Sequence, residues 1–165
     1  MKTYSTKLCF WLNIYNFLTI FTIIIKKEIL SNYYEWYRFL KNSHFIIGGF
    51  ELSLYEIENC ILTNNLASEN IYGEIRKFSE DDIRQELVLH DVERITYYAI
   101  SLPTKSSPGL RIYFPNNLFE LIRLNAIEYL SKNFIIDFDK GFLNTAEYIL
   151  WVDNDFLNHL CDYQE

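Results

Sequence analysis

Cysteine and histidine, the side chains that often carry chemistry in small proteins, are few in this chain and widely spaced. The three cysteines are Cys9, Cys60 and Cys161, and no two of them form a Cys-x-x-Cys pair. The sequence therefore predicts neither a zinc site nor a thioredoxin-like redox centre. We expect reduced thiols in a reducing compartment, with Cys9 and Cys60 buried because both lie in apolar helical contexts. The three histidines also lack metal-ligand spacing, so we expect no metal.

Cofactor and nucleic-acid binding find no support in the glycines or in the charge. Gly48-Gly49 lacks the surroundings of a P-loop or a dinucleotide fingerprint, so we expect no cofactor. The 165 residues include 15 Lys and Arg against 22 Asp and Glu, a formal net charge of −7. Phosphate-backbone binding needs clustered cations, so we expect no nucleic-acid partner. The acidic balance is typical of a solvated surface.

An apolar stretch at residues 8–25, followed by Lys26-Lys27, is near the minimum length that spans a bilayer. It could also be read as a signal peptide. Asn13 and Asn16 interrupt it and, three residues apart, share one face of a helix. An apolar helix with one polar stripe fits the centre of a small domain. We expect a buried helix in a cytoplasmic protein without a membrane partner, with a membrane anchor and a signal peptide as the alternatives.

The remaining elements follow from hydrophobic spacing and from helix-start signals. Ser53 and Glu56 form a capping-box pattern, and a similar start lies at Ser79. A short extended segment or turn is predicted at 45–50. Helices are predicted at 32–40, 53–62, 79–89, 118–132 and 146–160, and strands at 94–102, 110–114 and 134–138. Strands follow helices without strict alternation, so the fold class expected is α+β, a helix-rich single domain over residues 1–165 with a small central sheet.

Four segments, in the same order, resemble the family catalogued as domain of unknown function 547. FWLNIYN at 10–16 resembles that family's Phe-Trp-(Ile/Leu)-Asn-x-Tyr-Asn helix, and 49–62 resembles its Gly followed by Leu-Ser-Leu-x-x-Ile-Glu-His-x-Ile-Leu. Residues 97–113 resemble its strand and loop, and 149–156 resemble its terminal Ile-Phe-x-Trp-Tyr-x-x-Asp-Phe with a small slip. The resemblance covers about residues 8–157. It implies that the 10–16 segment is an internal helix of a soluble fold.

Departures from the family pattern fall on the residues most capable of chemistry. The family's histidine after Ile-Glu is Asn59 here, and its strand histidine is Tyr97. Its two loop cysteines are Leu102 and Ser107. The resemblance therefore implies that any thiol, imidazole or metal chemistry of the family has lost its carriers in this chain.

Six polar residues that the resemblance singles out form the predicted ligand-binding set. They are Asn13, Asn16, Glu58, Lys105, Ser106 and Arg111. If the N-terminal helix packs under the loop, its two amides could satisfy loop backbone groups. Alternatively, the amides could line a pocket whose two cations suit a small anionic ligand.

Catalysis by the remaining residues lacks a complete arrangement, so no catalytic residue is predicted. Ser106 or Ser107 would need an adjacent base to act as a nucleophile, and Glu58 is the best acid–base candidate. The leading hypothesis is a non-catalytic binding or interaction module for an unknown protein or a small anionic ligand. The alternatives are a hydrolase or transferase with a papain- or transglutaminase-like site, by analogy of fold alone, and a membrane-anchored domain.

Overall fold

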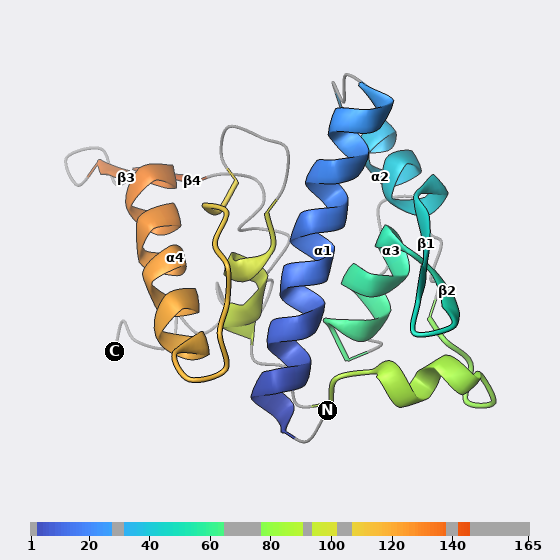
Figure 1. The fold of residues 1–165 in the computed structure, drawn as a ribbon. Coiled ribbons are helices and arrows are strands. Elements are labelled where there is room, and N and C mark those ends of the chain that lie inside the picture. Colours follow the sequence, from blue (N-terminus) through green and yellow to red (C-terminus); the bar gives the residue numbers. More distant parts are fainter. Residues whose placement is uncertain are drawn as a thin grey trace.

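The structure, a computed structural model, describes residues 3–27, 32–64, 77–90, 94–101, 107–137 and 142–145. One long helix, α1 (Tyr4–Lys26), lies in the middle of the fold. A hairpin and a short helix lie on one side of it, and the helix α4 (Leu118–Asn133) lies on the other (Figure 1). The helix-rich α+β class predicted from the sequence is confirmed.

The long helix α1 has a defined start and end. Thr3 is its N-cap, and the Thr3 hydroxyl accepts a hydrogen bond from the N–H of Thr6. At the other end Lys27 takes the left-handed conformation that closes many helices, and its N–H donates to the carbonyl of Ile23. The predicted helix at 8–25 is thus confirmed and extends by four residues at its start.

A helix and a hairpin follow α1. The helix α2 (Tyr33–Asn42) begins after Asn32, whose side chain accepts from the N–H of Glu35. The strands β1 (His44–Ile47) and β2 (Phe50–Ser53) pair antiparallel across a two-residue turn. That turn is Gly48-Gly49, with φ of 61° and 91°, which a two-residue hairpin turn favours and other residues adopt with strain.

The next helical segment starts as predicted and then changes its winding. Ser53 and Glu56 form the capping box, with the Glu56 N–H donating to the Ser53 hydroxyl and the Ser53 N–H donating to the Glu56 carboxylate. After the short α-helix α3 (Leu54–Glu56) the chain continues as a π-helix, η1 (Ile57–Ile61). Widened turns of this kind are rare and often occur at functional sites. The predicted helix at 53–62 is confirmed, with this local difference.

Two 3₁₀-helices lie in the second half of the chain. The first is η2 (Ile83–Leu87), which begins after Asp82 and lies inside the predicted helix at 79–89. The second is η3 (Arg94–Ala99), so the predicted strand at 94–102 is wrong over 94–99. Its β-branched and aromatic residues suit a strand, but here they pack against α4. The predicted strand at 110–114 belongs to neither sheet of the described residues.

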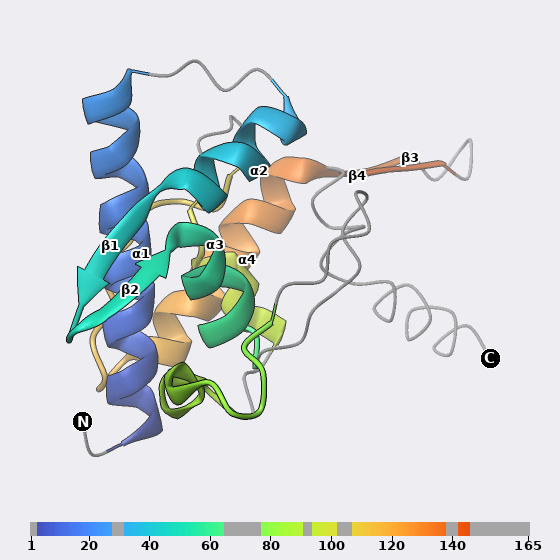
Figure 2. The same cartoon turned by 90° about the vertical axis from the view of Figure 1, so that its right-hand side faces the viewer.

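After α4, which confirms the predicted helix at 118–132, the strands β3 (Phe134–Asp137) and β4 (Phe142–Thr145) pair antiparallel. The strand predicted at 134–138 is thus confirmed, while the helix predicted at 146–160 lies outside the described residues. The sheet structure of the described residues consists of two separate hairpins, β1–β2 and β3–β4, on opposite sides of the fold (Figure 2).

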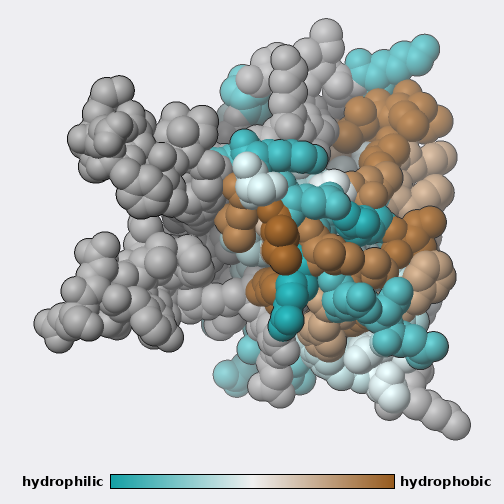
Figure 3. Space-filling model, turned by 90° about the vertical axis from the view of Figure 1, so that its left-hand side faces the viewer, coloured by the Kyte–Doolittle hydropathy of each residue, from teal (hydrophilic) through white to brown (hydrophobic). Residues whose placement is uncertain are grey.

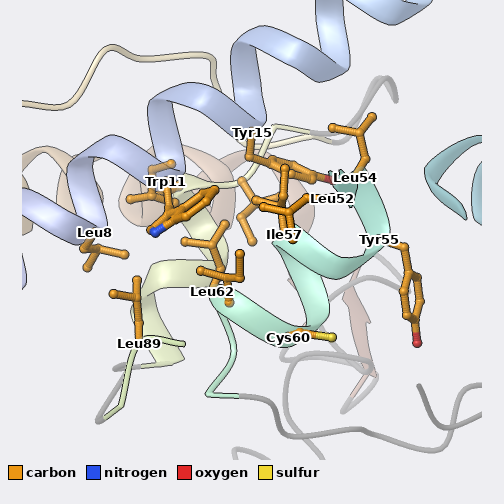
Figure 4. Close-up of a cluster of buried hydrophobic side chains, with 14 of the residues drawn as sticks. Leu8, Trp11, Tyr15, Leu52, Leu54, Tyr55, Ile57, Cys60, Leu62 and Leu89 are labelled. Carbon is orange, nitrogen blue, oxygen red and sulfur yellow. The ribbon is translucent and has the colours of Figure 1, made fainter. Parts of the chain in front are cut away.

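The hydrophobic core forms where α1 meets α3 and η1 (Figure 4). From α1, Leu8, Leu12 and Tyr15 are fully buried, at the spacing that places them on one face of a helix. Ile57 and Leu62 meet them from the other side. The same helix therefore fixes the position of the polar residues on its other faces.

Candidate functional site

The two asparagines of α1 each hold a remote piece of main chain through both ends of the amide. Asn13 donates from Nδ2 to the carbonyl of Tyr113 at 2.8 Å and accepts from the N–H of Tyr113 at 2.9 Å. Asn16, which is 2% exposed, donates to the carbonyl of Ala99 at 2.9 Å and accepts from the N–H of Ser101 at 3.0 Å. Both amides thus take the part that a neighbouring strand takes in a sheet.

A third amide, Asn125 of α4, completes this network, and the sequence analysis did not identify it. It is fully buried, and its Nδ2 donates to the carbonyls of Tyr98 and Gly109 at 2.8 and 2.7 Å. Its Oδ1 accepts from Nε of Arg111 at 3.1 Å. The available signal was an amide inside the apolar stripe of a predicted helix. Together the three amides fix η3 and the chain after the loop against α1 and α4.

Arg111, one of the predicted ligand-binding cations, is bound within this network. Besides its bond to Asn125, its guanidinium forms an ion pair with Glu128 of α4 at 2.5 Å. Ser107 lies at the start of the same segment, and its hydroxyl donates to the carbonyl of Pro108. The other two predicted loop residues, Lys105 and Ser106, lie outside the described residues.

Glu58 lies in the π-helix η1 and contacts a different side of α1. Its carboxylate accepts a hydrogen bond from the hydroxyl of Tyr15 at 2.5 Å. Residues two apart on a helix point in directions about 160° apart, so Tyr15 and Asn13 face away from each other. Burial raises the pKa of Glu58 from 4.5 to about 7, and the bond from Tyr15 opposes that rise. The predicted set of six residues therefore does not gather into one cluster: Glu58 lies apart from the amide network.

The thiols of the described residues are buried, as predicted for Cys9 and Cys60. Burial raises the pKa of Cys60 to about 12, with a contribution from the charge of Glu56, and burial also raises the pKa of Cys9. A thiol is a nucleophile only as the thiolate, so both are inert at neutral pH. Within the described residues no group of three or more His, Cys, Asp and Glu side chains could hold a metal ion.

A large apolar area, which we call the apolar face, lies on the surface beside the amide network (Figure 3). Four of its side chains come from α1 and three from the segment 110–114. They are Phe17, Phe21, Ile24, Ile25, Leu110, Ile112 and Phe114, and each is between 46% and 71% exposed. Phe17 and Phe21 stack on each other with ring centroids 5.8 Å apart. Contiguous exposed apolar surface of this kind marks interaction sites.

The helix α1 is also long and apolar enough to cross a membrane, with a mean hydropathy of 1.9 over its most apolar 18 residues. Half of those residues are buried inside the fold. Length and composition alone fit both a core helix and a membrane anchor.

Comparison with known proteins gives one match. A family model described as "Protein of unknown function, DUF547" matches residues 1–130. The matched region includes three of the four segments in which the sequence resembles that family, and the fourth, at 149–156, lies beyond it. No curated protein and no solved structure matches the chain.

Proposed function

The chain belongs to this family of unknown function, DUF547, and from that premise we propose that it is a non-catalytic interaction module. Its partner would bind to the apolar face formed by α1 and the segment 110–114. The family itself suggests no reaction, so the proposal rests on how the polar and apolar side chains of this chain are used.

The first support is that the amides and the cation are committed to the fold. Both ends of the Asn13, Asn16 and Asn125 side chains form hydrogen bonds within the protein. A ligand that recruited these amides would leave main-chain donors and acceptors unpaired, at a cost of about 1–3 kcal/mol for each group. The same holds for Arg111, whose charge is compensated by Glu128. A small anionic ligand would therefore have to compete with existing bonds.

The second support is that the groups suited to catalysis are engaged or unreactive. A hydrolase or transferase would need a nucleophile beside a base. The carboxylate of Glu58 accepts from Tyr15, the hydroxyl of Ser107 donates to Pro108, and the thiol of Cys60 has a pKa near 12. Among the described residues, no contact joins these groups into a catalytic pair.

The observation that carries the proposal is the apolar face itself. Most of the large apolar side chains of α1 that do not pack inward remain on the surface, although the helix supplies much of the core. Exposing them to water is unfavourable by about 25 cal/mol for each Å². A partner that covers this face removes that cost, which is the usual reason for a protein to display such a surface.

We further propose that α1 acts as a core helix of a cytoplasmic protein rather than as an anchor. Withdrawing it into a bilayer would break the bonds of Asn13 and Asn16 to three remote residues and expose the core side chains of Leu8 and Leu12. Two amides within hydrocarbon would add the cost of burying polar groups without partners. Purification of the chain from the soluble fraction without detergent is the expected result.

A photo-crosslinking amino acid placed in the apolar face tests the proposed function. Substituted at Phe17, it should capture a protein in living cells and give a discrete adduct. The matched control is Ile83, an equally exposed apolar residue on η2, which should give no such adduct. Equal labelling at both positions, or none at Phe17, would refute the interaction module. Hydrolase or transferase activity lost on substituting Glu58 or Ser107 would support the enzyme alternative instead.

A further inference from the structure

Within the apolar face, the segment 110–114 has the side-chain pattern of a strand. Leu110, Ile112 and Phe114 are 56–71% exposed, while Tyr113 is buried and Arg111 is mostly covered. Alternation of this kind places every second side chain on one surface of an extended chain. The segment runs beside α1, joined to it at Asn13 (Figure 1).

The main chain of the segment is paired along one edge alone. In an extended chain the N–H and C=O of successive residues point to opposite edges. Both main-chain groups of Tyr113 bond to Asn13, so those of Ile112 point away from α1. No hydrogen bond joins the N–H or the C=O of Ile112 to any group of the described residues, and no undescribed contact involves this residue. The segment therefore offers an open strand edge.

This edge has none of the features that normally prevent strand pairing. Natural proteins protect open edges with charged side chains, prolines or bulges. Here the outward positions 110, 112 and 114 carry Leu, Ile and Phe. The one charge, on Arg111, is held on the other side by Asn125 and Glu128. An edge without protection is suited to a strand that pairs with it.

We propose that the occupant is a second copy of this chain, with the two 110–114 segments paired antiparallel about a two-fold axis at Ile112. The inference rests on the proposed function and names the partner. In this register each Ile112 donates its N–H to the carbonyl of the other Ile112 and accepts in return. Leu110 of one copy then lies opposite Phe114 of the other. An interface with two-fold symmetry needs a surface that is complementary to itself, and this segment meets that need at its middle residue.

The size and chemistry of the face favour a protein over a lipid surface. The seven exposed side chains present on the order of 800 Å² together, which matches the roughly 800 Å² that each partner buries in a standard interface. Lipid tails would cover the same side chains but would leave the main-chain groups of Ile112 without hydrogen bonds. The net charge of −7 also opposes an anionic membrane surface.

Cysteine crosslinking tests the register directly, in the full chain with Cys161→Ser and with Cys9 and Cys60 buried. Ile112→Cys should form a disulfide-linked dimer under mild oxidation, because the Cα atoms of such a hydrogen-bonded pair lie about 5.5 Å apart, within disulfide range. Leu110→Cys alone should not, because its two copies would lie about 14 Å apart. A mixture of Leu110→Cys and Phe114→Cys should form the mixed dimer. Efficient crosslinking of Leu110→Cys alone would overturn the register.

Sedimentation velocity of the purified protein tests the dimer without crosslinking. The chain should sediment as a dimer at micromolar concentration, and Ile112→Pro, which removes the N–H, should sediment as a monomer with an unchanged circular dichroism spectrum. Ile83→Lys, outside the face, should remain dimeric. A monomeric wild-type chain would overturn this inference, and the proposed function would still stand if Phe17 captured a different protein in cells. Flotation of the wild-type chain with phosphatidylcholine vesicles would overturn both.

Discussion

Replacing Glu58 by glutamine should remove a pH dependence of stability that the wild-type chain has. Burial raises the pKa of Glu58 from 4.5 to about 7 in the folded protein, against the opposing hydrogen bond from Tyr15. The folded state therefore holds this proton more tightly than the unfolded chain does. The resulting stabilisation is complete below pH 4.5 and is lost as the pH rises through about 7.

The size of the effect follows from the pKa shift. One unit of pKa difference corresponds to about 1.4 kcal/mol, so ionising Glu58 in the folded state lowers the free energy of unfolding by up to about 3 kcal/mol. Glutamine is neutral at every pH and nearly the same shape, and its carbonyl can still accept from Tyr15. Glu58→Gln should therefore match the wild type near pH 4 and exceed its stability by up to about 3 kcal/mol near pH 8.

Urea unfolding, followed by the fluorescence of the buried Trp11, measures this difference across the pH range. Many other groups titrate over the same range, and the difference between Glu58→Gln and the wild type isolates the one carboxyl. Tyr15→Phe serves as the control: it removes the bond that favours the ionised form, so the loss of stability should begin at higher pH. Parallel stability curves for the wild type and Glu58→Gln would show that Glu58 titrates normally and that the reasoning is wrong.

Three further predictions concern single buried groups. Asn16→Ala should destabilise the fold by about 3 kcal/mol in urea, because it leaves the carbonyl of Ala99 and the N–H of Ser101 buried without partners; a loss below about 1 kcal/mol would count against the amide network. Thr19→Val should stabilise the protein by about 1 kcal/mol in the same assay, because the Thr19 hydroxyl is buried without a hydrogen bond; destabilisation would mean that this hydroxyl has a partner. In a Cys161→Ser background, the thiol of Cys60 should react with Ellman's reagent only after urea is added, and rapid labelling in native buffer would contradict its burial and raised pKa.

The elements that the sequence predicts well are those decided by local chemistry. The capping box at Ser53 and Glu56 occurs as its spacing implies, and α1 and α4 appear where apolar spacing places them. The error at 94–99 has a different origin. The residues of η3 would suit a strand, but their main chain is bonded by Asn16 and Asn125, which are up to 83 residues away in sequence. Local propensity cannot register partners that distant.

The candidate site was predictable to the same limited degree. The shared face of Asn13 and Asn16 follows from helix geometry, and so does the idea that their amides satisfy loop backbone. The sequence could not show that Asn125 joins them, because a single amide in an apolar helix stripe gives no sign of its partner. Nor could it show that Glu58 meets Tyr15, since two residues 43 positions apart come together through the packing of η1 on α1.

The arrangement of α1 explains why the segment 110–114 can be a strand without belonging to a sheet. A helix cannot normally pair with a strand, because its own main chain is already bonded. The side chain of Asn13 overcomes this by presenting one donor and one acceptor to Tyr113, as a strand residue would. It satisfies one edge and thereby fixes the direction of the other, at Ile112. The amide that the sequence marked as a ligand-binding residue is thus, on this reasoning, what keeps the dimer edge extended, and Asn13→Ala should weaken the dimer although it lies outside the paired strands.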